Sequence, residues 1–220
     1  MSEVIVMKEL LGENSRIAEE NREIYKADKV LMVNIMGAPG AGKTTLLKAV
    51  CGELKSRGVN SAVIEGDLYS SIDADAFNEK GIKSSQINTC GECHLDAAVI
   101  KSGYDMLGFK DGVVFIENVG NLICPAEFDL GENLKIVCAS VPEGDDKPYK
   151  YVPMFSYVDA VVLTKCDLKE AVGFDTDNFK KGMDAVNDAL IFETALGRSA
   201  SSAGDPGVKA LVDYILKNRN

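Results

Sequence analysis

The sequence contains no tryptophan, a single histidine and no long apolar run. No apolar stretch approaches the roughly 20 residues that a membrane-spanning helix needs, and the first residues, Met1-Ser2-Glu3, lack the basic and apolar parts of a secretory signal. Basic residues are also few: 24 Lys and Arg stand against 34 Asp and Glu, which gives a net charge of −10. A nucleic-acid partner requires a basic surface. These shortages argue against membranes and nucleic acids, and they predict a soluble, cytoplasmic protein.

Six cysteines are present among the 220 residues. In a cytoplasmic protein of this size they are more often thiols or metal ligands than a disulfide framework. Two of them, Cys51 and Cys138, fall on an apolar helix face and in an apolar strand, so we expect packed thiols there. The chain is long enough to bury a sizeable core. We expect one globular domain over residues 29–220, preceded by a separate segment at residues 1–28.

That first segment is rich in Glu, Lys, Arg and Asn, with a sparse apolar stripe. The stripe consists of Leu10, Leu11, Ile17, Ile24 and Tyr25. This spacing is typical of an amphipathic helix. We expect a helical arm that packs on the edge of the core; an oligomerisation element is the alternative.

A complete phosphate-binding motif, G-x-x-x-x-G-K-[ST], occupies residues 37–44. It follows an apolar run at residues 30–36, typical of a buried parallel strand, and precedes apolar residues at helical spacing. In such a unit, glycines let backbone N–H groups surround a phosphate at the positive end of the helix. Lys43 would reach the β and γ phosphates as a catalytic residue, and the Thr44 hydroxyl would hold Mg²⁺. The residues predicted to bind nucleotide here are Gly37, Ala38, Gly40, Ala41, Gly42, Lys43, Thr44 and Thr45.

Acidic residues at the ends of two later strands are predicted to complete the phosphate site. Glu117 ends an apolar run, and Gly120 follows three residues later; this layout brings a carboxylate to Mg²⁺ and a backbone N–H to the γ-phosphate. Asp67 follows a predicted strand at residues 59–64, at the edge of the sheet where ligands bind. We predict catalytic roles for Asp67 and Glu117, and a magnesium shell of Thr44, Asp67 and Glu117. A helix cap or a solvated loop acid is the alternative for Asp67.

A guanine-binding motif is indicated by Thr164-Lys165-Cys166-Asp167, directly after an apolar run at residues 159–163. The carboxylate of Asp167 can accept two hydrogen bonds from guanine, whereas adenine lacks this pair of donors. The stem of Lys165 can lie along the base. The motif is similar to the [NT]-K-x-D pattern of GTPases. Thr164, Lys165 and Asp167 are therefore predicted to bind the base, together with Ala195 after the last expected strand.

Further apolar runs at residues 134–141 and 189–194 complete a series of strands that alternate with helices. This alternation predicts an α/β fold of the P-loop NTPase kind, with a mostly parallel central sheet flanked by helices on both faces.

Metal chemistry is indicated by residues 88–97, NTCGECHLDA, which contain Cys90, Cys93 and the only histidine, His94. Thiolate and imidazole ligands favour Zn²⁺, Ni²⁺ or Cu over Mg²⁺ and Ca²⁺. Cys124 lies on the loop that leaves the second acidic strand, which supports a metal site. The alternatives are a redox pair of cysteines and c-type haem attachment, although haem attachment of this kind requires export, for which the sequence shows no signal.

The phosphate loop and two longer stretches together resemble the HypB family of GTPases, which help to insert nickel into [NiFe]-hydrogenases. The two stretches are ENVGNLICPAEFDLG at residues 117–131 and ECHLDA at residues 92–97. The resemblance runs over residues 29–220 and implies a P-loop fold that dimerises around nucleotide, slow GTP hydrolysis, and a nickel or zinc site built from Cys93, His94 and Cys124. It also implies hydrogenase maturation proteins and the hydrogenase large subunit as partners.

Three features depart from the family pattern. Residues 1–28 contain neither His nor Cys, so the nickel storage attributed to many members is not expected. Thr164 stands where Asn is commoner, but Asp167 is kept, and with it the preference for guanine. Cys90 is an additional thiol beside the usual Cys-His pair, and its part in the metal site is left open.

Two chains could complete the metal site. Two thiolates and one imidazole fall short of the four ligands of a closed zinc site, whereas a two-fold axis near Cys93 and Cys124 would bring four sulfurs together. We therefore predict a GTP-hydrolysing metallochaperone that couples nucleotide state and dimerisation to nickel delivery. A P-loop small-molecule kinase with structural cysteines, and a metal-binding module with incidental nucleotide binding, are the alternatives.

Overall fold

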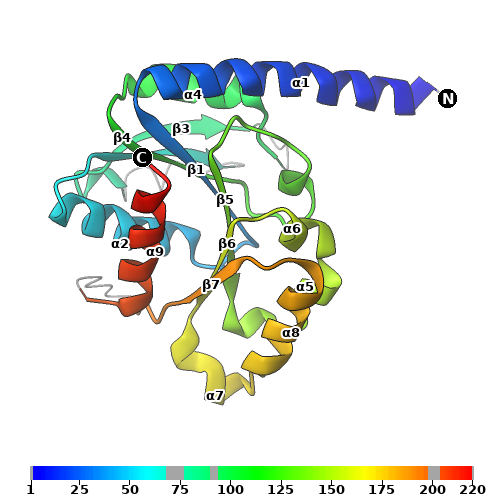
Figure 1. Ribbon diagram of the computed structural model, residues 1–220, viewed down its shortest axis with the longest axis vertical. Coiled ribbons are helices and arrows are strands. Elements are labelled where there is room, and N and C mark those ends of the chain that lie inside the picture. Colours follow the sequence, from blue (N-terminus) through cyan, green and yellow to red (C-terminus); the bar gives the residue numbers. More distant parts are fainter. Residues whose placement is uncertain (1, 68–76, 90–93, 198–203, 220) are drawn as a thin grey trace.

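The computed structural model describes residues 2–67, 77–89, 94–197 and 204–219 (Figure 1). Within these residues, seven strands form one sheet in the order β3-β2-β4-β1-β5-β6-β7, and every neighbouring pair is parallel. The strands are β1 (Val30–Met36), β2 (Ser61–Asp67), β3 (Lys83–Asn88), β4 (Gly112–Glu117), β5 (Leu134–Ser140), β6 (Ala160–Thr164) and β7 (Leu190–Glu193). The predicted α/β fold with a parallel central sheet is confirmed.

Burial on both faces explains the composition of the central strands. Every residue of β1 and of β4 is buried, because helices cover both faces of the sheet. A strand between two helical layers has to be apolar at consecutive positions rather than at alternate ones. The strongest apolar runs of the sequence are therefore the innermost strands.

Helices α2 (Lys43–Ser56) and α9 (Pro206–Lys217) lie side by side on one face of the sheet (Figure 1). The opposite face carries α1 (Ser2–Ala27) and α4 (Ala97–Leu107) over one half, and three helices over the other half. These three are α5 (Lys147–Lys150), α6 (Val152–Ser156) and α8 (Thr176–Val186). Short connecting elements are α7 (Lys169–Val172) and the 3-10 helices η1 (Cys124–Ala126), η2 (Val141–Glu143) and η3 (Cys166–Leu168).

The predicted N-terminal helix is present as α1. Its second half packs against α4 and the loop after η1, whereas its first turns extend past the sheet (Figure 1). The buried amide of Asn14 joins both neighbours: Oδ1 accepts the N–H of Ala97 at 2.9 Å, and Nδ2 donates to the carbonyl of Asp129 at 2.7 Å. Arg22 adds an ion pair with Asp129 at 2.6 Å. Neither α1 nor any other described helix combines the length and apolar character needed to cross a membrane.

Strand β3 was not among the strands expected from the sequence. It lies at the edge of the sheet and pairs only with β2. Its residues, KSSQIN, are mostly polar, and only Ser85 is buried. A strand with a single neighbour and little burial needs no apolar pattern, so periodicity could not reveal it.

Candidate functional site

The phosphate loop connects β1 to α2, and its path requires glycine. Gly37 has a φ of +146°, and a Cβ there would lie 2.3 Å from the carbonyl oxygen of Cys138. Gly42, directly before α2, has a left-handed φ of 95°. The loop therefore packs against β5 and ends at the positive end of α2, where backbone N–H groups bind phosphate.

Lys43 is the first residue of α2, and its side chain is buried inside the loop. Its Nζ donates to the carbonyl oxygens of Gly37 at 3.1 Å and Ala38 at 3.2 Å. These carbonyls hold the ammonium group at a position where phosphate oxygens could take their place. Thr44 and Thr45 follow in the first turn of the helix.

A hydroxyl and two carboxylates meet beside the loop. Thr44 Oγ1 donates to Oε1 of Glu117, the last residue of β4, at 2.6 Å. Glu65 lies next to Glu117 in the β2–β4 register, and both carboxylates are buried. These hard oxygen donors are of the kind that Mg²⁺ prefers, so the residues fit that ion. They line a cavity of about 250 Å³ together with Pro39, Gly40, Lys43, Gly66, Asn118, Val119 and Gly120.

Glu65 is a site residue that was not predicted from the sequence. It stands two positions before Asp67, on the same face of β2, but only the register with Glu117 shows that it reaches the cavity. Asp67 is the last residue of β2, and its side chain lies outside the described part of the structure.

The chain that leaves β4 is tied to the phosphate loop. Gly37 and Asn121 form an isolated antiparallel bridge. Gly120 packs on Pro39 so closely that a Cβ at Gly120 would lie 2.9 Å from the proline ring. The segment leading to Cys124 is therefore held against the phosphate loop at Asn121 and Gly120.

The predicted guanine-binding motif also lies against the phosphate loop. Thr164 is buried at the end of β6, and its Oγ1 donates to the carbonyl oxygen of Ala41 at 2.6 Å. The next residue, Lys165, has a left-handed φ of 57°, and its Nζ donates to the carbonyl oxygen of Gly40 at 2.8 Å. Thr164 and Lys165 thus both fix the backbone of the phosphate loop by side-chain hydrogen bonds.

Asp167 and Ala195 lie on two neighbouring segments at this edge. Asp167 is exposed in η3, and the N–H of Cys166 donates to the carbonyl oxygen of Thr194 at 3.0 Å. The backbone N–H of Ala195 donates to Asp205 Oδ2 at 3.1 Å. A base that used this N–H group would have to displace Asp205.

Of the predicted soft-metal ligands, the structure places His94 and Cys124. The imidazole of His94 stacks on Phe128, with 3.9 Å between ring centroids and 20° between planes. Phe128 lies four residues after Cys124, which is half-buried at the start of η1. Cys90 and Cys93 lie outside the described residues. Within the part of the chain that is described, no three His, Cys, Asp or Glu side chains are grouped closely enough to hold a metal ion.

Cys51 and Cys138 are packed thiols, as predicted. Both are buried free cysteines. Burial raises the pKa of Cys51 to about 11 and the pKa of Cys138 to about 12. Both therefore stay protonated near neutral pH, and neither is suited to bind a metal.

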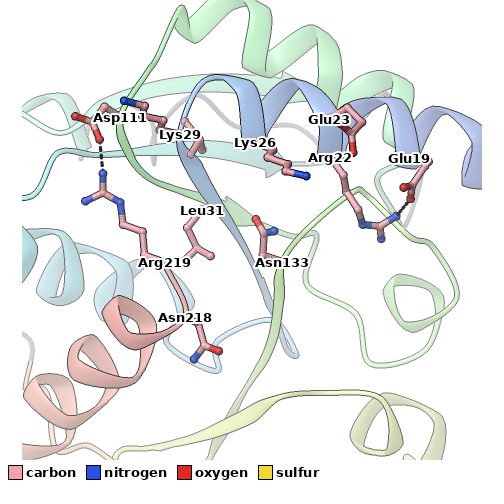
Figure 2. Close-up of a pocket in the computed structure, with 11 residues that line it drawn as sticks. Glu19, Arg22, Glu23, Lys26, Lys29, Leu31, Asp111, Asn133, Asn218 and Arg219 are labelled. Carbon is pink, nitrogen blue, oxygen red and sulfur yellow. Dashed lines mark hydrogen bonds and ion pairs between the residues drawn. The ribbon is translucent and has the colours of Figure 1, made fainter.

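A larger cavity, of about 680 Å³, lies at the opposite end of the sheet, between the end of α1 and the C-terminus (Figure 2). Most of its charged residues are paired. Arg219 binds Asp111, and Arg22 binds both Glu19 and Asp129. None of the residues predicted to bind nucleotide lines it.

The chain matches one family model and is similar to curated proteins of that family. Residues 31–193 match the family model described as CobW/HypB/UreG, nucleotide-binding domain. The hydrogenase maturation factor HypB of Azotobacter chroococcum mcd 1 is 44% identical over 175 residues, which are 79% of this chain and 57% of that protein. The chain thus spans little more than half the length of this curated relative.

Two solved structures agree over almost the whole chain. HypB from Helicobacter pylori in complex with nickel has a TM-score of 0.86 and 35% identity, covering 94% of this chain and 95% of that one. The hydrogenase maturation factor HypB from Archaeoglobus fulgidus has a TM-score of 0.84 and 38% identity, covering 96% and 100%. Both support the strand order and the N-terminal helix described above.

Proposed function

The chain belongs to the CobW/HypB/UreG family of nucleotide-binding proteins, and from this membership we propose that it is a GTP-hydrolysing metallochaperone. Its nucleotide state and homodimerisation would control the delivery of nickel for the maturation of [NiFe]-hydrogenases. Its partners would be hydrogenase maturation proteins and the hydrogenase large subunit. Two observations on relatives support this: the Azotobacter protein is named a hydrogenase maturation factor, and the Helicobacter protein was solved with nickel.

The observation that carries the proposal is the hydrogen bond between Thr44 and Glu117 beside the buried Lys43. Lys43 would exchange its two carbonyl partners for oxygens of the β and γ phosphates. Thr44 and Glu117, with Asp67 and the newly found Glu65, would hold Mg²⁺. When bound, Mg²⁺ would neutralise part of the charge that develops on the phosphates during hydrolysis.

Guanine would be selected by Asp167, with Lys165 lying along the base. Asp167 is exposed beside a motif that is already fixed to the phosphate loop, so its carboxylate can reach a base without a rearrangement of β6. Ala195 would contribute its N–H group after release from Asp205.

Nickel or zinc would bind at Cys93, His94 and Cys124. The stacking of His94 on Phe128 supports this set, because it brings the imidazole to the loop that begins at Cys124. In a symmetric dimer, Cys93 and Cys124 of both chains would supply four sulfurs. The buried free thiols of Cys51 and Cys138 support a reducing, cytoplasmic setting.

The test of base choice compares GTP with ATP. The full chain with Mg²⁺ is expected to hydrolyse GTP and to leave ATP intact. Asp167→Asn should lower GTP affinity roughly tenfold to a hundredfold, because hydrogen bonds to a charged group are lost. Equal GTP binding by the variant and the wild type would contradict the assignment. Consumption of ATP alone would favour a kinase.

The test of the metal site uses sedimentation with a non-hydrolysable GTP analogue, with and without Ni²⁺ or Zn²⁺. The wild type is expected to form a dimer that binds metal, and the double variant Cys93→Ala/Cys124→Ala should lose metal binding. Metal-independent dimerisation together with unchanged metal affinity in the double variant would contradict the proposed site.

A further inference from the structure

Asn34 is a polar residue in the middle of β1, and its side chain is fully buried at the centre of the sheet. Its neighbours in the strand, Val33 and Ile35, are apolar and equally buried. A buried amide is strongly disfavoured unless polar groups meet it. The partners of Asn34 therefore indicate what the residue does.

Asn34 lies between a carboxylate and an amide from two other segments. Its Nδ2 donates to Oε1 of Glu132 at 3.1 Å, and its Oδ1 accepts from Nδ2 of Asn118 at 3.2 Å. Both partners are buried as well. The charge of Glu132 is offset by Lys135, whose Nζ lies 3.6 Å from Oε1.

The carboxylate sets the direction of every hydrogen bond in this series. Glu132 can only accept, so the NH₂ group of Asn34 faces it and the oxygen of Asn34 faces Asn118. Asn118 then donates to Asn34, and its own Oδ1 accepts the backbone N–H of Val119 at 2.9 Å. At the other end, Oε2 of Glu132 accepts the N–H of Leu130 at 2.7 Å. We call this series, from Val119 through Asn118, Asn34 and Glu132 to Leu130, the Asn34 relay.

The two ends of the Asn34 relay lie at the two parts of the proposed function. Asn118 and Val119 line the phosphate cavity. Leu130 belongs to the loop between η1 and β5, which also carries Phe128, the stacking partner of His94. The relay thus connects the nucleotide site to the loop that begins at Cys124 by crossing β1 at Asn34.

We propose that Asn34 is a positioning residue that couples the nucleotide site to this metal-bearing loop, an inference that rests on the function proposed above. A phosphate that binds the backbone at Val119 and Gly120 changes the position of Asn118. Hydrogen bonds tolerate only small displacements. The side chain of Asn34 therefore either moves together with Asn118 or loses its hydrogen bond to it, and in both cases the hydrogen bond between Glu132 and the N–H of Leu130 changes. By linkage, metal at the loop alters nucleotide affinity by the same factor.

The experiment measures the Ni²⁺ affinity of the full chain against a chromophoric chelator, once with Mg²⁺ and GDP and once with Mg²⁺ and a non-hydrolysable GTP analogue. The ratio of the two affinities is the coupling, which should be at least about fivefold in the wild type. Asn34→Leu keeps a branched side chain but removes both hydrogen bonds. It is expected to bring the ratio to within about twofold of one, with each nucleotide still bound within about threefold of wild type.

Asn133→Ala is the matched control. Asn133 Oδ1 accepts the N–H of Met32 at 2.8 Å, so it also joins this loop to β1, but through a hydrogen bond that is not part of the Asn34 relay. It is expected to keep the wild-type ratio. Equal loss of coupling in Asn34→Leu and Asn133→Ala would mean that coupling depends on the general packing of this loop against β1, and it would overturn the proposal.

Glu132→Gln keeps the proposal testable if Asn34→Leu does not fold. The new NH₂ group has to face either Leu130 or Asn34. If it faces Leu130, the N–H of Leu130 loses its acceptor. If it faces Asn34, the amides of Asn34 and Asn118 have to turn over, and the N–H of Val119 loses its acceptor. Faster amide hydrogen exchange at Val119 or Leu130 is expected, together with a ratio closer to one. Unchanged exchange at both amides with unchanged coupling overturns the proposal.

The wild-type ratio distinguishes a failure of the proposed function from a failure of the Asn34 relay. A wild-type ratio of one contradicts the coupling in the proposed function, and the relay fails with it. Wild-type coupling that survives in Asn34→Leu overturns only the relay.

Discussion

A cavity lies at each end of the central parallel sheet, and the two cavities differ in what their charged residues contact. At the carboxyl ends of β1, β2 and β4, about 250 Å³ is enclosed by the phosphate loop, Lys43 and the carboxylates Glu65 and Glu117. At the amino ends of β1, β4 and β5, about 680 Å³ is lined by residues of α1, the strand starts and the C-terminus (Figure 2).

The difference favours the smaller cavity as the nucleotide site, because the chemistry of its residues suits phosphate and Mg²⁺ whereas the larger cavity only offers more volume. In the smaller cavity, Lys43 donates to two backbone carbonyls and Glu117 accepts from a hydroxyl; phosphate and Mg²⁺ could take the place of these partners. In the larger cavity, Arg22 and Arg219 are neutralised by acidic residues. Lys26, Lys29 and Arg219 lie at or just after the C-terminal ends of α1 and α9, where positive charge complements the helix carbonyls.

The largest expected effect is that of Lys43→Ala. It removes the cation aimed at the phosphates, so GTP hydrolysis should fall by at least about a hundredfold. Thermal unfolding should change little, because the hydrogen bonds of the Lys43 side chain go to two carbonyl oxygens of the loop, of Gly37 and Ala38. Lys26→Ala, which removes a lysine from the larger cavity, is the control and should hydrolyse GTP at the wild-type rate. A normal rate of GTP hydrolysis by Lys43→Ala would contradict the assignment of the phosphate site to the smaller cavity.

Gly120→Ala should have a smaller effect. The new Cβ would lie within 3.1 Å of backbone atoms of Pro39, so the loop and the strand end have to separate. We expect a loss of about 1–3 kcal/mol in the free energy of unfolding and weaker binding of Mg²⁺–GDP. Both are measured by denaturant titration with and without nucleotide.

Gly12→Ala is the matched control for that substitution. Gly12 lies in α1 with nothing within 4 Å of the added Cβ, so the helix should gain about 0.5–1 kcal/mol. Equal losses from the two substitutions would mean that Gly120 has no special contact with the phosphate loop.

The smallest effect is expected from Arg219→Ala. Its partner Asp111 is largely exposed, and exposed ion pairs contribute about 0–1 kcal/mol. Stability should fall by less than about 1 kcal/mol, with nucleotide and metal affinities unchanged in titration calorimetry. A marked loss of nucleotide affinity would give the larger cavity a role that its paired charges do not suggest.

The sequence predicted best what is contiguous along the chain. The turn between β1 and α2 and the strands buried on both faces each carry their signal within a few residues. β3 was missed because an edge strand with little burial needs no apolar pattern. Glu65 was missed because its place in the cavity follows from the register of β2 with β4.

Contacts between distant residues could not be predicted from a single sequence. Asn34 stands in an apolar run without any local reason, and its partner Glu132 lies 98 residues away. Asn14 on α1 joins Ala97 and Asp129, which lie 83 and 115 residues away along the chain. An amphipathic stripe predicts that a helix packs, but not which polar groups fix it in place.

The most direct test of the nucleotide assignment is hydrogen exchange on the full chain with Mg²⁺ and a non-hydrolysable GTP analogue, compared with the corresponding ATP analogue. Protection is expected with the GTP analogue at residues 37–45, 117–121 and 164–167, and no change at residues 26–31 or 217–219. Protection at the opposite end of the sheet, or the same protection by the ATP analogue, would contradict a guanine-nucleotide site in the smaller cavity.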